Sequence, residues 1–534
     1  MDVKTLQDNL AYYGQEHLLK FWPSLTDEQR TLLYDDLASL DLAEVTEIFQ
    51  HCNITPSEEN GKLDELLQPI PSEHHGSLSR TSPDLLDIYR KEGLRQIAEG
   101  RVAVLLLAGG QGTRLGVNYP KGMYDVGLPT QKTLYHLQGE RIVRLEHLAE
   151  ELTGKRGSVP WYIMTSGHTM GPTLEFFASH NYFGLRKENI VMFEQGMLPC
   201  FTFDGKIIQQ SPWKIATAPD GNGGLYRALR KKGIIDDMER RGIKYIHVYC
   251  VDNILVKMAD PVFIGYCISK GANCAAKVVE KSFPMEPVGV VCKVAGKYQV
   301  VEYSEITPRT AQKRGPDGRL MFNAANICNH FFTLDFLRDV TNSNNLKHHV
   351  ARKKIPYTND NGQIVKPEKP NGIKLEKFVF DVFEFTNKFA VWEVLRKDEF
   401  SPLKNADGAE KDTPTTARED LFDLHRRYLQ KAGGKIAEVN GHPVSLIHNG
   451  SSVYQNGTAN DHGHHNNDSS DTQNKSIKPY SKRTEVCEIS PLVTYDGEGL
   501  EELVKGKTFV PPVILDFPYE HNFHQNGPNN IRSD

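Results

Sequence analysis

Six consecutive apolar residues, Val102 to Leu107, constrain the fold of this chain more than any other segment. A strand with one wet face alternates apolar and polar side chains, so an unbroken apolar run indicates a strand covered on both faces. The run leads directly into Ala108-Gly-Gly-Gln-Gly-Thr-Arg114. Because open α/β sheets bind ligands beyond the carboxyl ends of their strands, this glycine-rich loop is a predicted phosphate site.

The same alternation of strand and helix patterns continues from about residue 84 to residue 400. The predicted strands and helices follow one another in the order 102–107, 133–152, 161–165, 173–180, 189–193, 224–240 and 245–250. Such alternation predicts an α/β fold with right-handed crossovers and a mainly parallel sheet between helices. The apolar runs 288–294 and 298–303 flank Ala295-Gly-Lys297, which predicts an antiparallel hairpin on the substrate side.

The first 83 residues are predicted to be a helical N-terminal region followed by a linker. Thr26 and Gln29 precede an apolar helical pattern as a capping box would. Residues 68–83 are rich in turn formers and lack periodicity, so we expect a connection that crosses the surface. The nucleotide-binding part is then expected over 84–404.

Residues 405–534 are predicted to form a small C-terminal domain that contains β-structure. It begins with a helical pattern near 415–432 and is interrupted by a polar stretch at 449–483. That stretch has too few apolar residues to offset the entropy of ordering it, so a disordered insertion is expected.

Composition narrows the class of protein. Hydrophobic residues make up 39% and charged residues 25%, as in ordinary soluble enzymes, and the net charge of −5 argues against a nucleic-acid-binding surface. The chain starts without a basic segment and apolar core, and it has no apolar run of 18 residues, so a cytoplasmic protein without a membrane partner is expected. Its eight cysteines include no Cys-x-x-Cys pair and are expected to be reduced core residues.

The spacing within the glycine-rich loop excludes two common phosphate-binding motifs. A dinucleotide fingerprint requires a third glycine where Leu115 stands, and a P-loop requires a glycine where Gln131 precedes Lys132. The remaining pattern, Gly-x-Gly-Thr-Arg-x-Gly-x-x-x-Pro-Lys, ends at Lys121. Arg114 and Lys121 supply two cations beside backbone N–H groups that glycines leave accessible.

Three further side chains fall at or after predicted strand ends. Gln195 carries a donor and an acceptor that match the edge of a uracil ring, although such a residue is also common in loops. Asn222 lies in a glycine-rich segment that a flat ring could approach. Asp252 follows strand 245–250 and is the expected Mg²⁺ anchor of a triphosphate site, with a turn cap as the alternative.

Two lysines are also candidates for phosphate binding. Lys374 and Lys404 lie among apolar or turn residues, whereas a solvated lysine usually lies on a charged face. Each could therefore reach inward as a point charge.

Eight segments together resemble the eukaryotic UDP-N-acetylhexosamine pyrophosphorylases. They are 107–129, 160–167, 218–229, 246–257, 286–294, 301–306, 371–383 and 401–407. The resemblance extends from Gly14 to Pro491, with departures at Gln131, Ala325 and Cys328. It implies a Rossmann-like nucleotidyltransferase domain with a mainly parallel mixed sheet, flanked by the helical N-terminal region and the small C-terminal domain.

The resemblance also assigns roles to individual positions. The positions that match the family's UTP contacts are Leu107, Ala108, Gly109, Gly110, Lys121, Gln195, Gly221, Asp252 and Lys374. Those that match its sugar contacts are Asn222, Gly289, Glu302, Tyr303, Asn326, Phe378, Phe380 and Lys404. The implied catalytic residues are Arg114, Lys121, Lys404 and Asp252, and Asp252 is also the implied ligand of Mg²⁺ or Mn²⁺.

The implied reaction converts UTP and N-acetylglucosamine 1-phosphate into UDP-N-acetylglucosamine and pyrophosphate, in a monomer or homodimer. The sequence leaves open whether N-acetylgalactosamine 1-phosphate also reacts. A UDP-glucose-type pyrophosphorylase and a non-catalytic UDP-sugar sensor are the alternatives. An NAD-dependent oxidoreductase is disfavoured by the glycine spacing.

Overall fold

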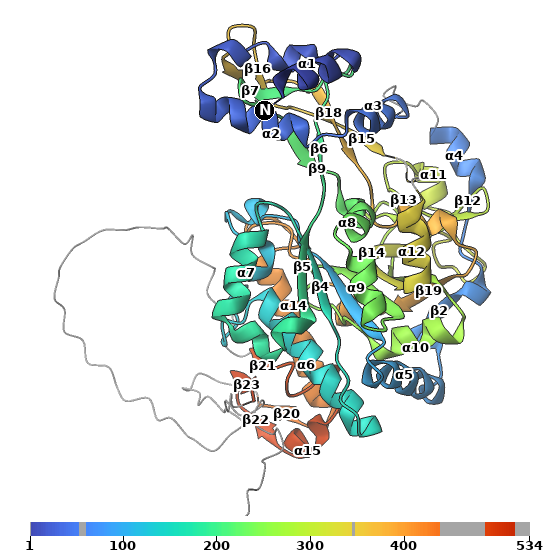
Figure 1. The fold of residues 1–534 in the computed structure, drawn as a ribbon. Helices are drawn as coiled ribbons and strands as arrows, with labels where there is room; N and C mark the ends of the chain where they lie inside the picture. The colour runs from blue at the N-terminus through green and yellow to red at the C-terminus, as the bar shows by residue number, and fades with distance from the viewer. Residues whose placement is uncertain (1, 53–59, 344–345, 347, 438–485, 518–534) are drawn as a thin grey trace, which may run out of the picture.

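The computed structural model describes residues 2–52, 60–343, 346, 348–437 and 486–517 (Figure 1). Its centre is an 11-stranded sheet with the main order β2-β19-β11-β14-β10-β3-β4-β5. These strands are β2 (His75–Ser77), β19 (Phe389–Val394), β11 (Cys274–Glu280), β14 (Ala324–Thr333), β10 (Tyr245–Cys250), β3 (Val102–Leu107), β4 (Trp161–Thr165) and β5 (Ile190–Glu194).

The sheet is mainly parallel, as predicted. Along the main order, β14 is antiparallel to both of its neighbours. The other neighbouring pairs are parallel. The α/β class and the mixed sheet that the sequence predicted are therefore confirmed.

Both faces of β3 are buried under helices. Val102, Val104 and Leu106 join the core cluster that contains residues of α5 (Pro83–Ala98), α6 (Leu134–Thr153) and α10 (Pro261–Ser269). The alternate residues of β3 join a second cluster with α8 (Leu225–Lys231), α9 (Ile234–Arg240) and α12 (Leu334–Asn342). The unbroken apolar run thus reflects a strand between two cores.

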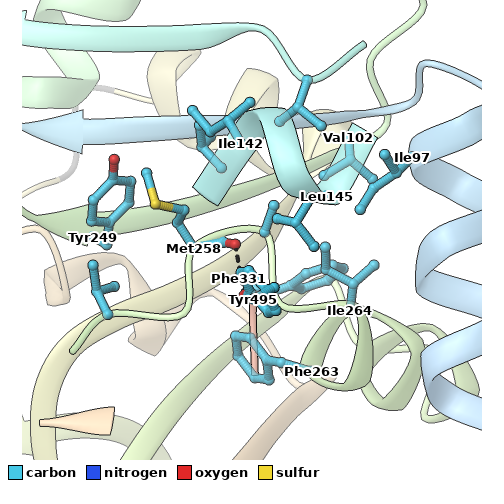
Figure 2. Packing of buried hydrophobic residues seen from close by; sticks show 14 of the residues in the cluster. Ile97, Val102, Ile142, Leu145, Tyr249, Met258, Phe263, Ile264, Phe331 and Tyr495 are labelled. Carbon is cyan, nitrogen blue, oxygen red and sulfur yellow. Dashed lines mark hydrogen bonds between the residues drawn. The ribbon is translucent and has the colours of Figure 1, made fainter. Parts of the chain in front are cut away.

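Figure 2 shows part of the first of these cores, where helix and strand residues from distant parts of the chain meet. Ile97 and Leu145 come from α5 and α6, whereas Tyr495 comes from the C-terminal segment. The Tyr495 hydroxyl donates a hydrogen bond to the Met258 carbonyl at 3.0 Å. Side chains beyond the expected boundary at 404 therefore belong to the central core.

Most predicted elements lie close to the observed ones, with one helix divided. The segment expected as a helix at 224–240 forms α8 and α9, which separate at Gly233, whose φ is 65°. The predicted hairpin is β12 (Val290–Val294) and β13 (Lys297–Val301). Its two turn residues, Ala295 and Gly296, both have positive φ, as the tight turns favoured by twisted hairpins require.

The N-terminal helices share their core with two segments from the middle of the chain. These helices are α1 (Val3–Tyr12), α2 (Asp27–Ala38) and α3 (Leu42–Gln50), and α2 begins with the predicted Thr26–Gln29 capping box. They pack on Leu198, Phe201, Ile207, Ile215, Ile373 and Leu375. Those residues lie in or beside β6 (Met197–Pro199), β8 (Lys214–Ile215) and β18 (Gly372–Glu376), at the end of the molecule that Figure 1 shows at the top.

Residues 68–83, expected as a linker that crosses the surface, include residues of two short strands of the main sheet. β1 (Leu67–Gln68) pairs with β12, and β2 adds a parallel strand beside β19. Gly76 allows this strand to fit, because a Cβ there would lie 2.6 Å from the Tyr266 ring and 2.7 Å from the Trp392 ring. A strand of three residues that includes glycine has no recognisable periodicity, so only these tertiary contacts define it.

The C-terminal segment backs the glycine-rich loop and then forms a small β-containing unit. Leu421 and Phe422 of α14 (Pro414–Lys431) cluster with Val126 and Leu128, which follow that loop. The later elements are β20 (Lys435–Ile436), β21 (Cys487–Ile489), α15 (Leu500–Val504), β22 (Thr508–Phe509) and β23 (Val513–Leu515). The polar stretch 449–483 lies outside the described residues.

All eight cysteines are free thiols, but they are not all core residues. Cys200, Cys267, Cys274, Cys292 and Cys487 are buried as expected. Cys52, Cys250 and Cys328 are only partly buried, so the expectation is wrong for these three. Among the helices of the described residues, none is long and apolar enough to span a membrane.

A buried ion cluster joins three elements near the sheet, and its loss should destabilise the fold. The fully buried Lys277 ammonium on β11 lies 2.7 Å from Asp260 and 2.6 Å from Glu399. We expect Lys277→Ala to leave two buried carboxylates without their cation and to lower the unfolding free energy by about 3–5 kcal/mol.

Urea unfolding of the variant and of Lys91→Ala would test this expectation. Lys91 forms a 2.6 Å ion pair with Asp87 on an exposed helix surface. Its replacement should cost less than about 1 kcal/mol. Equal costs for the two variants would contradict a structural role for the buried cluster.

Candidate functional site

The candidate site begins where β3 and β10 end side by side. The two strands are parallel and in register, so Leu107 lies opposite Cys250. The loops that leave the two strands therefore emerge next to each other. One carries Lys121 and the other carries Asp252, and the Lys121 Nζ atom lies 3.8 Å from Asp252 Oδ2. Their side chains are 18% and 21% exposed, so the pair is accessible to a ligand.

Two hydrogen bonds hold the glycine-rich loop, one within the loop and one from a residue that follows β4. The Gly112 N–H donates to the Tyr119 carbonyl at 3.1 Å, and the Ser166 hydroxyl donates to the Gly109 carbonyl at 3.0 Å. A Cβ at Gly112 would lie 2.4 Å from Val117, whereas a Cβ at Gly110 would meet nothing within 4 Å. Gly112 therefore shapes the loop, and Gly110 faces open space. Ser166 has no motif signal beyond its position after strand β4.

Arg114 and Lys121 lie on short helical turns of this loop. Arg114 belongs to the turn Thr113–Leu115 and is exposed, while the neighbouring Leu115 is buried and anchors the turn. Lys121 begins the turn Lys121–Met123. In the described part of the chain Arg114 has no carboxylate partner, so its charge is available to an anion.

Asn253 fixes the loop that carries Lys404 against the loop of Asp252. Its amide donates to the Glu399 carbonyl at 2.7 Å and accepts from the Ser401 N–H at 2.9 Å. The Leu403 N–H donates to the Asp252 carbonyl at 2.8 Å. Lys404 is thereby held next to Asp252 along the backbone, with an exposed side chain. Sequence analysis assigned Asn253 no role, and only its position after Asp252 could have indicated one.

Gln195 borders the glycine-rich loop. Its backbone N–H donates to the Thr165 carbonyl at 2.9 Å, which places it at the end of β5 beside β4. A Cβ at Gly109 would lie 3.0 Å from the Gln195 amide nitrogen. The residue at 109 must be small for this amide to lie against the loop. Gln195 is therefore a direct neighbour of the glycine-rich loop.

The loop that carries Gly221 and Asn222 is hydrogen-bonded to the segment that follows β18. Gly221 has a φ of 79°, which favours glycine. The Gly223 N–H donates to the Lys377 carbonyl at 2.8 Å, and the Asn222 amide oxygen accepts from the Val379 N–H at 3.0 Å. A ring bound over these glycines would thus meet the 377–380 segment as well.

Asp220 is a buried carboxylate beneath this loop that the sequence analysis did not identify. It is 2% exposed, and burial raises its pKa to about 6, although the Arg227 charge opposes the rise. A Cβ at Gly224 would lie 1.7 Å from Asp220 Oδ1. Gly224 therefore makes room for the Asp220 side chain, and Gly221 and Gly223 make room for the backbone of Lys377.

Three of the predicted sugar contacts meet beside β14. The Asn326 N–H donates to the Gly289 carbonyl at 2.9 Å, and a Cβ at Gly289 would lie 3.1 Å from Glu302 Oε1. Burial raises the pKa of Glu302, and the nearby Glu305 adds to the rise. Tyr303 follows in the chain and is 46% exposed. This group offers a carboxylate and an amide to hydroxyl groups.

The rings of Phe378 and Phe380, two of the positions matched to sugar contacts, lie together with a third ring, that of His349. The Phe378 and Phe380 rings stack with centroids 5.1 Å apart, and the His349 ring lies 4.6 Å from Phe378. His349 Nε2 lies 3.1 Å from both Asp381 oxygens. Burial alone would lower the pKa of His349, but the hydrogen bond and charge of Asp381 outweigh it and raise the pKa. No sequence motif indicated His349.

Lys374 lies on the ribbon formed by β15 (His349–Lys353) and β18. The neighbouring Ile373 pairs with Phe201. Burial raises the pKa of Cys200 to about 11, and the Lys374 charge opposes that rise. The structure therefore places Lys374 near the N-terminal unit, and it shows no contact in the described residues between Lys374 and the glycine-rich loop.

The residues near Asp252 could hold only a metal ion whose other ligands are phosphate oxygens and water. Within the described ranges, no group of three or more His, Cys, Asp and Glu side chains is placed to hold a metal ion. Asp252 is a partly exposed carboxylate just after the end of β10, 3.8 Å from the Lys121 ammonium. Mg²⁺ fits such a position because it commonly uses one or two carboxylates together with phosphate oxygens and water.

Comparison with known proteins matches this arrangement to one family. The family model for UTP–glucose-1-phosphate uridylyltransferase matches residues 49–441. A human protein named UDP-N-acetylhexosamine pyrophosphorylase-like protein 1 is 53% identical over 511 residues, covering 94% of this chain and 95% of that protein. The UDP-N-acetylglucosamine pyrophosphorylase of Saccharomyces cerevisiae is 42% identical over 436 residues, covering 80% and 91%.

Two solved structures have a similar fold. The uridine diphosphate N-acetylglucosamine pyrophosphorylase from Trypanosoma brucei, solved with an inhibitor, has a TM-score of 0.74 and 29% identity, and the match covers 97% of this chain and 98% of that one. A protein from Entamoeba histolytica described as a UDP-N-acetylglucosamine pyrophosphorylase has a TM-score of 0.70 and 34% identity, covering 84% and 100%.

The glycine contacts predict which substitutions the folded loops tolerate. A Cβ at Gly223 would lie 2.6 Å from backbone atoms of Lys377 and Phe378. We expect Gly223→Ala to lower the unfolding free energy by about 1–3 kcal/mol, because backbone must move. Gly110→Ala should leave it unchanged, because nothing lies within 4 Å. Thermal unfolding of both variants would show the difference, and equal melting temperatures would refute the contacts at Gly223.

Proposed function

The chain belongs to the family of UTP–glucose-1-phosphate uridylyltransferases, and we propose that it joins UTP to N-acetylglucosamine 1-phosphate, giving UDP-N-acetylglucosamine and pyrophosphate. The observation that carries the proposal is the Lys121–Asp252 pair beside the open face of Gly110. The two sides of this pair suit different substrates. Gln195 and the glycine-rich loop lie on one side, and the group around Asn326 lies on the other, where Asn326 belongs to β14, the neighbour of β10.

The reaction requires a phosphate oxygen of the sugar phosphate to attack the α-phosphorus of UTP in line, while pyrophosphate leaves from the opposite side. The sugar phosphate is already ionised at neutral pH, so no strong general base is needed. The difficulty is to bring several negative charges together in one geometry. The main contribution of the protein to the reaction is therefore a set of positive charges that are in place before the substrates bind.

The residues on the nucleotide side suit this task. Arg114 and Lys121 supply fixed positive charges beside the N–H groups of Gly109 and Gly110, and Lys404 approaches from the loop hydrogen-bonded to Asp252. Gln195 can pair with the uracil edge while Gly221 allows the ring to lie flat. Lys374 would have to approach from the β15–β18 ribbon to reach a phosphate.

The residues on the sugar side favour an N-acetylamino sugar. Glu302 and Asn326 can bind hydroxyl groups, and Asn222 offers an amide nitrogen next to the 377–380 segment. The stacked Phe378 and Phe380 rings offer an apolar wall to an acetyl methyl group. A UDP-glucose-type enzyme would have no use for that wall. The solved UDP-glucose pyrophosphorylases from Leishmania major are 15–16% identical to this chain and support only the fold.

We also propose that Asp252 holds Mg²⁺, or Mn²⁺, together with UTP phosphates. A divalent cation there would neutralise developing charge on the transferring group. Asp252 alone supplies too few ligands for Mg²⁺, so the remaining ligands would be phosphate oxygens and water. The cationic side chains of the site would help to bring those phosphates to Asp252. A cytoplasmic monomer or homodimer completes the proposal, and the eight free thiols are consistent with a reducing compartment.

A non-catalytic UDP-sugar sensor is the second candidate function. Such a protein could lose the charges that the reaction needs. Arg114, Lys121, Asp252 and Lys404 are all present in this chain, which favours an enzyme.

Pyrophosphate release from UTP with a panel of sugar 1-phosphates tests the proposal. We expect release with N-acetylglucosamine 1-phosphate, weaker release with glucose 1-phosphate, and a loss of release when EDTA removes divalent cations. N-acetylgalactosamine 1-phosphate belongs in the panel because its preference is open. The absence of release with both amino-sugar phosphates would refute the proposed function.

Arg114→Ala should slow turnover on the order of 10²-fold or more, because a cation that stabilises the transferring phosphoryl group is lost. The side chain is exposed, so the melting temperature should change little. Arg240→Ala is the matched control, because Arg240 is 74% exposed on α9. Turnover near that of the unmodified protein would remove Arg114 from the mechanism.

A further inference from the structure

Two cysteines lie side by side on the neighbouring strands β10 and β14 at the candidate site. Tyr249 on β10 pairs with Asn329 on β14, so the next residues along the two antiparallel strands are Cys250 and Cys328. Their Sγ atoms are 3.0 Å apart, and the Cys250 thiol donates to the Cys328 sulfur. Both remain free thiols in the structure. Cross-strand neighbours of this kind lie within the Cα separation that a disulfide spans.

A local irregularity of β14 turns Cys328 toward its neighbour. The register between β11 and β14 shifts where Ala276 pairs with His330 and Val278 pairs with Asn326. Cys328 lies inside this bulge and has a φ of 52°, an uncommon value for a residue with a Cβ. Bulges commonly redirect side chains next to binding sites. The Cys328 N–H donates to the Asn326 side chain at 3.1 Å, which ties the bulge to the sugar side.

The pair lies between the two halves of the site. Cys250 precedes Asp252 by two residues, and Cys328 follows Asn326 by two residues. Both cysteines are partly exposed, whereas the five core cysteines are buried. Part of each residue is therefore open to solvent, unlike the core cysteines. The mechanism proposed above assigns neither thiol a role.

We propose that Cys250 and Cys328 form an oxidisable dithiol that a peroxide converts into a disulfide, and that this disulfide disables the site. The effect on turnover rests on the proposed function, whereas the oxidation itself does not. The proposal follows from the short sulfur separation, the bulge and the place of the pair between Asp252 and Asn326. It gives this chain a modification site between its phosphate and sugar subsites.

The chemistry balances with one peroxide for each pair of thiols. The Cys328 thiolate attacks a peroxide oxygen, the O–O bond breaks, and a proton converts the departing hydroxide to water, which leaves a sulfenic acid. The Cys250 sulfur then attacks the Cys328 sulfur, the S–O bond breaks, and the hydroxyl leaves as a second water with the Cys250 proton. Two electrons pass from the sulfur atoms to the peroxide.

Disulfide formation must change the geometry of the site. The sulfur atoms are 3.0 Å apart, and a disulfide bond is about 2.05 Å long. Closing that gap draws the bulge toward β10 and displaces the Asn326 amide that accepts from the Cys328 N–H. It also pulls on the start of the Asp252 loop. Both substrates lose part of their binding geometry, so turnover should fall.

Peptide mapping of the full-length protein after peroxide treatment tests the oxidation directly. We expect one cross-linked peptide pair that joins Cys250 to Cys328, with the mass of two hydrogens missing, and its disappearance after dithiothreitol. Pyrophosphate release should be lost in parallel and should return on reduction. The mapping uses the unmodified chain, so its result does not depend on the folding of any variant.

Cys328→Ser and Cys250→Ser should each prevent reversible inactivation, measured as the ratio of activities before and after peroxide. Cys52→Ser is the matched control, because Cys52 is the other partly exposed cysteine and lies on the N-terminal unit. It should remain as sensitive as the unmodified protein. The absence of the cross-linked peptide would overturn the dithiol, and a disulfide that leaves turnover unchanged would overturn its effect on the site.

A protein that shows no pyrophosphate release before oxidation would refute the proposed function instead. The peptide map would still decide whether the dithiol forms. The two proposals therefore fail by different measurements.

Discussion

The parallel pairing of β3 with β10 is the constraint on which the candidate site depends. Each strand fixes one half of the site, since Lys121 follows β3 and Asp252 follows β10. A shift of one residue would move the apolar side chains of β3 to the opposite faces. Both faces are core, so the apolar pattern alone would tolerate such a shift. The flanking helices, packed against alternate residues of β3, must hold the register that brings the loops together.

The buried Lys277 ammonium helps to position another loop of the site, the one that carries Lys404. Lys277 on β11 holds the Glu399 carboxylate at the end of α13 (Arg396–Glu399), and the Glu399 carbonyl accepts from Asn253. Asn253 in turn holds the segment that leads to Lys404. The chain of contacts runs from the interior of the sheet to an exposed lysine. Burying Lys277 is costly by itself, so its two carboxylate partners are what make this link stable.

Sequence analysis predicted what local patterns determine and missed what distant contacts determine. The strands at 161–165 and 245–250 have the predicted bounds because their apolar runs end at polar or turn residues. The three residues of β2 have no such pattern, and they become a strand only against β19. The N-terminal helices share a core with residues near 200 and 373, which no composition boundary marks. His349 likewise gains its role only from Asp381 and Phe378, which lie about thirty residues later in the chain.

Before any substrate binds, one cation of the site has a carboxylate partner and, among the described residues, two do not. Lys121 lies 3.8 Å from Asp252, whereas Arg114 and Lys404 have no carboxylate partner in the described ranges. Unpaired cations in water cost little while they remain exposed and apart, and both side chains are exposed. In the proposed function, a triphosphate would supply the missing negative charge and would compete with Asp252 for Lys121. That competition would free the carboxylate for the proposed divalent cation, so nucleotide binding and metal binding should favour each other.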